Sequence, residues 1–230
     1  MALRVDWGKS LVSVMGIRFY VEGAQTGANS KLAKQEARKA FHVFLTEIRE
    51  GASKQKIEWH RIVICGSRRN AYEAFCDAVK KEAEIFHVLL VDAEENALGD
   101  SYKSGKIWDY LLSRPADRWE KPAEAEEHHV YLMVRTMETW IIADQDNLAK
   151  FYKNGFSKKS LPARKNLEES PKSQNYESLK KATEKTTAKA YHKTKHAFAL
   201  LETTNPEVVK KACPSCERLF SKLPEVLQSV

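Results

Sequence analysis

The chain has 230 residues, 43% of them hydrophobic and 30% charged, a composition that supports a folded core and excludes a disordered chain. No stretch approaches the roughly 20 apolar residues that cross a bilayer, so we expect no membrane segment. Four cysteines are too few for a disulfide framework in a chain of this length. We therefore expect a reduced, cytoplasmic protein.

The net charge of +7 is unevenly distributed along the chain. Residues 150–195 contain 13 lysine and arginine residues against four glutamates, whereas the remainder contains 25 basic and 27 acidic residues. A basic segment of this kind attracts polyanions such as nucleic acid through counterion release. A solvated, lysine-rich surface without a ligand gives the same pattern, and composition alone does not separate the two.

The N-terminal two-thirds of the chain alternates between strand-like and helix-like segments. Predicted strands cover residues 17–23, 60–66, 86–94 and 128–135, and predicted helices cover residues 30–50 and 70–84. The third strand, 86–94, is an almost unbroken apolar run, which is typical of a central strand buried on both faces of a parallel sheet. The order predicts an α/β fold with a mostly parallel sheet of about four strands flanked by helices.

The rest of the chain is predicted to be helical, apart from an insertion at residues 95–127. The insertion contains a short predicted helix at 107–114 and then a polar loop. Its Trp108, Tyr110, Leu111 and Leu112 either form an interaction face for a partner or cap the sheet. After the fourth strand, predicted helices cover residues 137–152, 175–187, 190–203 and the segment from 206 onward. We therefore divide the chain into an α/β core, 1–152, and a basic helical extension packed on it, 153–230.

Three acidic residues stand at predicted strand ends. Glu22 ends the first strand, and Asp92 and Glu94 end the third. Parallel α/β sheets place their active sites at the carboxyl ends of strands, and residues two apart in an extended segment point the same way. Hard cations such as Mg²⁺ prefer carboxylate oxygens, so the pattern predicts a metal site. The alternatives are helix capping or solvation of a loop, and Glu95 competes with Glu94 as the ligand.

The predicted helix at 137–152 adds two more acidic candidates. Asp144 lies within an apolar stripe, where a carboxylate needs a hydrogen bond, an ion pair or a metal, and we count it as a candidate metal ligand. Glu138 lies in the first turn and is a candidate catalytic residue. The alternatives are an internal hydrogen bond for Asp144 and a favourable helix-dipole interaction for Glu138.

Basic residues are predicted at the same edge of the sheet. The loop after the second strand supplies Arg68, Arg69 and Asn70, which suit phosphate contacts near a helix N-terminus. The helix at 190–203 begins with further candidate phosphate ligands, which are His192, Lys193 and Lys195. Lys193 or Lys195 is expected to neutralise charge developing on a phosphorane, and Lys193 is counted as the candidate catalytic residue. The alternative for Arg68 and Arg69 is a pair of exposed arginines without a ligand. The alternative for the start of the helix at 190–203 is a pair of histidines on a helix face beside solvent-exposed lysines.

The lone C-x-x-C segment, Cys213 to Cys216, is interpreted as structural. A structural zinc site needs four ligands, and a second cysteine pair is not present in the sequence. A redox motif of this type follows a strand, whereas these cysteines fall in a region predicted to be helical.

Six segments, in order, resemble an uncharacterised prokaryotic Toprim-like family from about residue 17 to about residue 222. They are YVEG, ICGSRRNAYEAF, LLVDAE, MVRTMETWIIAD, FYKNGF and YHKTKHAFALL. YVEG and LLVDAE look like the Glu and Asp-x-Asp signatures of the Toprim fold, which also occurs in nucleases of the overcoming-lysogenization-defect type. Glu94 stands where that signature has its second Asp, so the carboxylate is kept on a longer side chain.

The resemblance implies roles for the acidic residues and a biological setting. It implies that Glu22 acts as a general acid/base or metal ligand and that Asp92 and Glu94 bind Mg²⁺. Members of the family are often encoded beside an ABC-type ATPase, in settings suggestive of phage defence. The chain itself has no recognisable nucleotide-binding loop, so we expect any ATP hydrolysis to come from that partner.

We expect a nuclease that depends on Mg²⁺ or Mn²⁺ and acts on DNA or RNA as the effector of an ATPase-linked phage-defence system. The first alternative is a non-catalytic nucleic-acid-binding or regulatory subunit that keeps a Toprim fold. The second is a primase-like nucleotidyl enzyme, against which the small size of the chain argues. The oligomeric state stays open.

Overall fold

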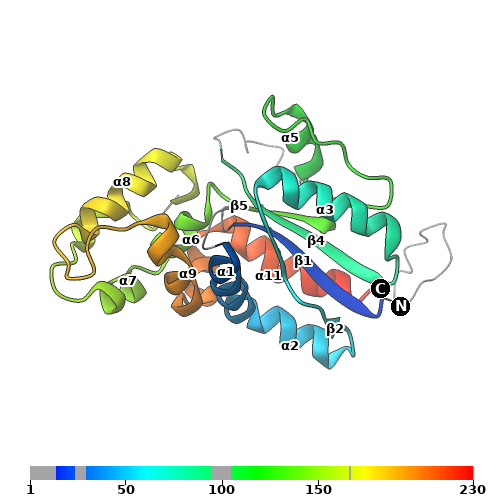
Figure 1. Cartoon of the computed structure of the whole chain (residues 1–230), viewed down its shortest axis with the longest axis horizontal. Coiled ribbons are helices and arrows are strands. Elements are labelled where there is room, and N and C mark those ends of the chain that lie inside the picture. Colours follow the sequence, from blue (N-terminus) through cyan, green and yellow to red (C-terminus); the bar gives the residue numbers. More distant parts are fainter. Residues whose placement is uncertain (1–13, 24–29, 95–104, 166, 230) are drawn as a thin grey trace.

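The computed structural model describes residues 14–23, 30–94, 105–165 and 167–229. Its centre is a five-stranded sheet (Figure 1). The strands are β1 (Gly16–Glu22), β2 (Glu58–Trp59), β3 (Val63–Gly66), β4 (Ile85–Asp92) and β5 (Val130–Met133). β1 pairs with β4, β4 with β5, and β2 and β3 pair with successive parts of β1. Because these pairings are all parallel, the carboxyl ends of β1, β3, β4 and β5 lie along one edge of the sheet.

Helices connect the strands and form most of the C-terminal region. They are α1 (Ser30–Phe44), α2 (Thr46–Lys54), α3 (Arg68–Lys81), α5 (Ile107–Ser113), α6 (Met137–Ala143), α7 (Gln145–Tyr152), α8 (Lys172–Thr183), α9 (Lys193–Thr203), α10 (Pro206–Ala212) and α11 (Pro214–Leu227). Short 3-10 turns are η1 (Glu127–His129), η2 (Lys158–Ser160) and η3 (Leu167–Glu169). None of the helices in the described part of the chain has the length and apolarity needed to span a membrane.

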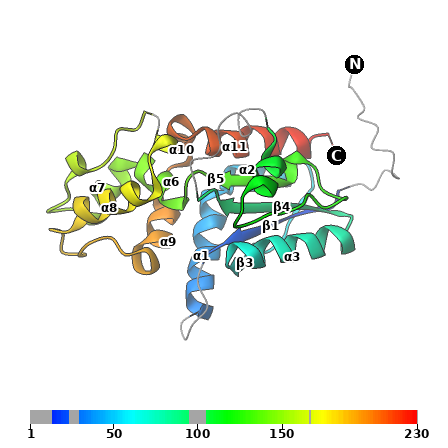
Figure 2. The same cartoon turned by 90° about the horizontal axis from the view of Figure 1, so that it is seen from above.

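The two faces of the sheet are covered by different helices. One face packs against α3 and α5, where Phe75, Trp108 and Leu111 are buried against Leu89 of β4. The other face is covered by α1, α2, α6 and the C-terminal helices (Figures 1 and 2). The fold is therefore the predicted α/β arrangement, with a parallel sheet between helical layers.

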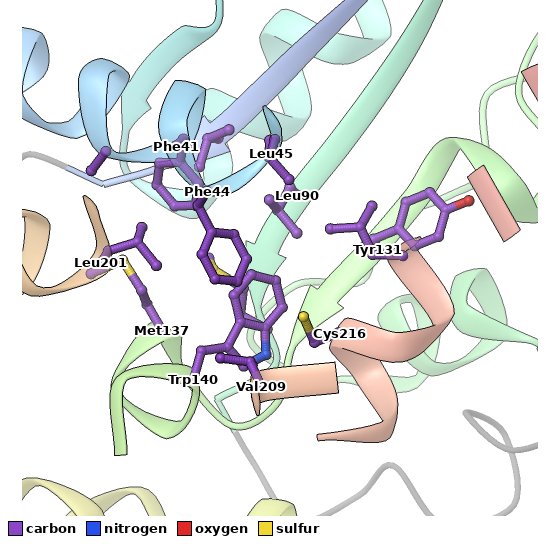
Figure 3. Close-up of a cluster of buried hydrophobic side chains, with 14 of the residues drawn as sticks. Phe41, Phe44, Leu45, Leu90, Tyr131, Met137, Trp140, Leu201, Val209 and Cys216 are labelled. Atoms are coloured by element: carbon purple, nitrogen blue, oxygen red, sulfur yellow. The ribbon is translucent and has the colours of Figure 1, made fainter. Parts of the chain in front are cut away.

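The larger core cluster joins the C-terminal helices to the sheet. Phe44 of α1 stacks on Trp140 of α6 with ring centroids 5.3 Å apart. Leu201 of α9 and Val209 of α10 are fully buried in the same cluster, which also contains Leu90 of β4 (Figure 3). The helices after residue 152 therefore contribute side chains to the same hydrophobic core as the sheet.

Several predicted elements are divided in the structure. The predicted helix at 30–50 is two helices, α1 and α2, separated at Leu45. The predicted strand at 60–66 begins later, at Val63, and the two-residue strand β2 precedes it along the same side of β1. The predicted helix at 137–152 is broken at Asp144, which caps α7 by accepting a hydrogen bond from the Asn147 backbone N–H at 3.1 Å.

The described part of the insertion caps the sheet. Trp108, Tyr110 and Leu111 of α5 are at most 3% exposed and belong to the core cluster beneath α3. Of the two alternatives for these residues, burial inside the molecule supports a cap on the sheet for Trp108, Tyr110 and Leu111, whereas Leu112 is 50% exposed. Glu95, the alternative to Glu94, lies outside the described residues.

Candidate metal centre

Three carboxylates meet at the carboxyl edge of the sheet. Ligand atoms of Glu22, Asp92 and Glu94 lie within 4.8 Å of one another. Glu22 and Asp92 end the adjacent strands β1 and β4, and a Glu22 carboxylate oxygen accepts a hydrogen bond from the Asp92 backbone N–H at 3.2 Å. The Asp92 Oδ1 in turn accepts a hydrogen bond from the backbone N–H of Met137 at 2.8 Å. Strand pairing therefore brings together acids that are 70 residues apart in sequence.

Glu94 reaches the cluster through a turn. Its φ of 70° is left-handed, so the segment after Asp92 is not the extended one assumed from the sequence. The backbone N–H of Glu94 donates to the Arg135 carbonyl at 2.8 Å, which fixes this turn against the end of β5. Ala93 is fully buried. The convergence of Asp92 and Glu94 is thus as expected, but a turn produces it.

Burial and mutual repulsion raise the pKa values of the innermost acids. Burial first, and the neighbouring Glu22 carboxylate next, raise the pKa of Asp92 well above its usual value. Burial likewise raises the pKa of Glu22, although the charge of Arg68 opposes that shift. Carboxylates that repel one another in a partly buried site suit a hard divalent cation, which removes the repulsion and accepts oxygen ligands.

Each of the three carboxylates also faces a cation from a separate helix. Arg68 of α3 lies 3.9 Å from Glu22, and Lys193 of α9 lies 3.9 Å from Asp92. Lys172, the first residue of α8, donates a hydrogen bond to Glu94. Lys172 could not be singled out from the sequence, because it lies in a basic segment with many exposed lysines and carries no motif. The site therefore combines acids from the sheet edge with cations from the surrounding helices.

Glu138 joins the site through Lys193. The Glu138 side chain is buried on α6, 3.6 Å from the Lys193 ammonium, and accepts a hydrogen bond from the Tyr191 hydroxyl at 3.0 Å. Burial opposes charge on Lys193, yet the Glu138 and Asp92 carboxylates hold the pKa of Lys193 above its usual value. Lys193 is therefore an ammonium ion at neutral pH and suits charge neutralisation better than proton abstraction.

Comparison with protein families assigns the chain to a known group of sequences. The family model described as "Domain of unknown function (DUF4276)" matches residues 24–224. The chain belongs to the DUF4276 family. The match includes Asp92, Glu94, Glu138 and Lys193 and begins two residues after Glu22. No curated protein and no solved structure matches the chain.

Asp144 is not part of the acidic cluster of this DUF4276 protein. One of its oxygens caps α7 at the Asn147 N–H, and the other accepts a hydrogen bond from the Asn205 backbone N–H at 2.9 Å. Among the residues that the structure describes, the group with metal-ligand geometry is Glu22, Asp92 and Glu94. The assignment of Asp144 as a metal ligand is therefore wrong. Asp144 has a structural role, in which its carboxylate accepts internal hydrogen bonds.

Of the predicted phosphate contacts Arg68, Arg69 and Asn70, which form the first turn of α3, only Arg68 faces the carboxylates. Gly66, with φ of 86°, turns the chain, and the Ser67 hydroxyl caps α3 by accepting from the Asn70 N–H at 3.2 Å. This turn directs Arg68 inward, whereas Arg69 is 83% exposed and pairs with Glu73 at 2.7 Å. The Asn70 side chain donates to the Cys65 carbonyl at 3.3 Å. Arg68 therefore fits a role at the site, and Arg69 and Asn70 are occupied in local contacts.

The histidines near the start of α9 form local hydrogen bonds. The His196 Nδ1 accepts from the His192 backbone N–H at 3.1 Å and lies 3.0 Å from the Tyr152 hydroxyl. His192 and Lys195 are both exposed, so they are surface residues of the same helix start. Of the candidates in this segment, Lys193 is the one that contacts the acids.

The C-x-x-C segment lies in the core. Cys213 and Cys216 are free thiols and fully buried, and burial raises the pKa of both. A buried thiol with a raised pKa is a poor nucleophile, which supports the structural interpretation.

Proposed function

We propose that this DUF4276 protein is a metal-dependent nuclease that hydrolyses phosphodiester bonds in DNA or RNA. The observation that carries the proposal is the cluster of Glu22, Asp92 and Glu94 at the carboxyl edge of a parallel sheet, with ligand atoms within 4.8 Å of one another. Such a donor set suits Mg²⁺ or Mn²⁺, which activates water and stabilises the leaving oxygen of a phosphodiester. The Toprim resemblance of the same residues supports the proposal.

The chain's own side chains divide into metal ligands and phosphate contacts under this proposal. Asp92 and Glu94 hold the cation, and Glu22 serves as a further ligand or as the general acid/base. Lys193 and Arg68 neutralise charge on the phosphate, because each already lies 3.9 Å from a carboxylate of the cluster. Glu138 acts through Lys193, which it holds as an ammonium ion at the site.

The basic segment supports a polyanionic substrate. Lys172 and Lys193 belong to residues 150–195, so the most positive part of the sequence includes two cations of the site. Exposed lysines of the same segment, such as Lys181, Lys185 and Lys189, extend the positive charge beyond it. A nucleic acid that reaches the carboxylates would gain affinity from these charges through counterion release.

The resemblance also supports a partner and a setting. We propose that the protein works in the cytoplasm with an ABC-type ATPase as the effector of a phage-defence system. The described α5 residues Trp108, Tyr110 and Leu111 are buried, so a partner contact in this region would use exposed positions such as Leu112. Co-purification of the two proteins, with Leu112→Asp compared with Leu32→Asp at another exposed leucine, tests whether this region contributes.

One observation favours the alternative of a non-catalytic nucleic-acid-binding subunit. Each carboxylate of the cluster faces a cation, which lowers the cost of burying acids when metal is absent. A protein that uses the edge of the sheet only to hold itself together would keep these ion pairs and need no metal.

A cleavage assay separates the two functions. Purified protein, alone and with the neighbouring ATPase, is incubated with plasmid DNA and total RNA in Mg²⁺, Mn²⁺ or EDTA. The nuclease proposal predicts metal-dependent cleavage that Asp92→Asn abolishes and Asp77→Asn retains, since Asp77 is an exposed acid on α3. Cleavage by the Asp92→Asn protein at the wild-type rate would reject the assignment, and nucleic-acid binding without cleavage in any condition would favour the alternative.

A further inference from the structure

The segment from Gly105 to Glu127, the described part of the insertion, contacts the backbone between two of the clustered acids. The Tyr110 hydroxyl donates a hydrogen bond to the Ala93 carbonyl at 2.7 Å. Tyr110 is 1% exposed and Ala93 is fully buried, so this bond is shielded from water. Ala93 separates Asp92 from Glu94, and its carbonyl belongs to the peptide that leads into Glu94.

This peptide is held at both of its polar atoms. Its carbonyl accepts from Tyr110, and its N–H, which belongs to Glu94, donates to the Arg135 carbonyl at 2.8 Å. The orientation of a peptide plane sets the φ of the residue that follows it, which here is the left-handed φ of 70° at Glu94. A left-handed glutamate is unfavourable in isolation and persists where surrounding contacts fix it.

The same segment contacts the site a second time, through Arg68. Asp117 accepts a hydrogen bond from the Arg68 guanidinium at 2.6 Å, and Trp119 lies under that guanidinium at 4.9 Å from its ring centroid. The Asp117 side chain is 6% exposed. These contacts hold Arg68 in place 3.9 Å from the Glu22 carboxylate.

We propose that residues 105–127 position the proposed metal ligands, with Tyr110 acting on Glu94 through the Ala93 peptide and Asp117 acting on Glu22 through Arg68. Neither Tyr110 nor Asp117 touches the cation or the substrate in this scheme; both are positioning residues. The inference rests on the proposed metal site and extends it, because it assigns the geometry of a ligand at the end of β1 and of a ligand just after β4 to a single segment of the chain. Outer contacts that orient metal ligands typically change metal affinity by tenfold or more when removed.

Tyr110→Phe tests the inference with a matched control. The substitution removes the hydroxyl that contacts Ala93 and keeps the ring in the core. Tyr131→Phe is the control, because Tyr131 is also 1% exposed and its hydroxyl has no hydrogen-bond partner among the described residues. Mn²⁺ affinity is measured by isothermal titration calorimetry for the full-length wild type and both variants, and the melting temperature is measured without metal.

We expect Tyr110→Phe to bind Mn²⁺ about tenfold more weakly than wild type, and Tyr131→Phe to bind it equally well. Asp117→Asn, which weakens the hold on Arg68, should also lower Mn²⁺ affinity. A purely structural role for Tyr110 would lower the melting temperature and leave the metal affinity unchanged, and that result overturns the inference while the metal site stands. A wild-type protein that binds no Mn²⁺ rejects the proposed metal site and this inference with it.

Discussion

Asp92 is the most deeply buried of the clustered acids, with 4% of its surface exposed, and it lies between Glu22 and Lys193. Its Oδ1 accepts from Met137 N–H at the start of α6, so one oxygen is committed to the fold. Its Oδ2 is the oxygen that lies nearest the Lys193 ammonium. The residue therefore links the helix start to the charged edge of the sheet.

The raised pKa of Asp92 makes a prediction about stability without metal. Burial and the Glu22 charge raise its pKa in the folded state above the usual value of 3.8. The contribution of Asp92 to stability is therefore fully present below pH 3.8 and is lost as the pH rises through the folded-state pKa. The side chain in Asp92→Asn cannot ionise. In EDTA, the free energy of unfolding of Asp92→Asn minus that of wild type should therefore increase as the pH rises.

Urea unfolding over a series of pH values measures this gain. Asp77→Asn, at an exposed aspartate with 74% of its side chain accessible, should show no comparable change relative to wild type. A difference between Asp92→Asn and wild type that stays constant with pH would contradict the raised pKa.

Lys172 supplies a prediction about metal affinity. Its ammonium group donates a hydrogen bond to the Glu94 carboxylate and therefore competes with a metal cation for the same oxygen. The side chain is 45% exposed, so the ion pair is screened, and exposed pairs contribute up to about 1 kcal/mol, which corresponds to about fivefold in affinity. Lys172→Gln should therefore bind Mn²⁺ about two- to fivefold more tightly at low salt, with a smaller gain at high salt.

Lys180→Gln is the matched control for this titration. Lys180 is on the same helix, is 43% exposed and pairs with Glu177 at 3.4 Å, so its removal should leave Mn²⁺ affinity near the wild-type value. Equal or weaker Mn²⁺ binding by Lys172→Gln would mean that Lys172 does not compete with the cation.

The sequence identified the acids of the site more completely than the residues that contact these acids. Glu22 and Asp92 stand at strand ends in the sequence, and parallel pairing brings strand ends together. Lys172 and Asp117 carry no such signal, since each meets its partner through tertiary packing across 78 and 49 residues, respectively. Asp144 was misassigned because a continuous helix places it within an apolar stripe, whereas a break in the helix makes it a cap.

Among the elements, the helices that surround the sheet edge each bring one cation to the acids. α3, α8 and α9 begin at or next to Arg68, Lys172 and Lys193, so all three cations lie in a first helical turn. The strands β1 and β4 were predicted almost to their boundaries, because long apolar runs mark buried strands. The breaks at Leu45 and Asp144 were missed, because both neighbouring helices keep an apolar face across the break and periodicity alone shows no boundary there.

The basic elements α8 and α9, with the loop between them, give a prediction about nucleic-acid binding. Lys181, Lys185 and Lys189 are exposed in this region. Each phosphate contact contributes about 0.9 to the slope of log affinity against log salt on duplex DNA. The triple substitution to Gln should therefore weaken binding to all sequences alike and flatten that slope by about 2 to 3.

A triple variant at the opposite edge of the sheet is the control. Lys54, Lys80 and Lys81 are exposed near the C-terminal ends of α2 and α3, where the chain turns into the amino ends of β2 and β4. Their replacement by Gln removes the same charge and should leave the slope close to wild type. A slope that both triple variants change equally would place the binding surface elsewhere.

Over the whole molecule, the parallel sheet and the uneven charge act together. The strand order places the acids on one edge, and α8 and α9 from the basic segment, residues 150–195, place cations on the same edge. Alternating apolar segments predicted this class of fold from the sequence. The packing of the C-terminal helices into the larger core was only expected in outline, because it depends on side chains such as Val209 and Leu201 whose partners are distant in sequence.

The metal site itself is tested most directly by titrating Mn²⁺ into full-length wild type, Asp92→Asn and Asp77→Asn by calorimetry at one pH and one salt concentration. If Glu22, Asp92 and Glu94 hold a divalent cation, wild type and Asp77→Asn bind Mn²⁺ with the same affinity, and Asp92→Asn loses at least tenfold while it remains folded. Equal Mn²⁺ affinity in Asp92→Asn and wild type, or no binding by any of the three, would contradict the metal site.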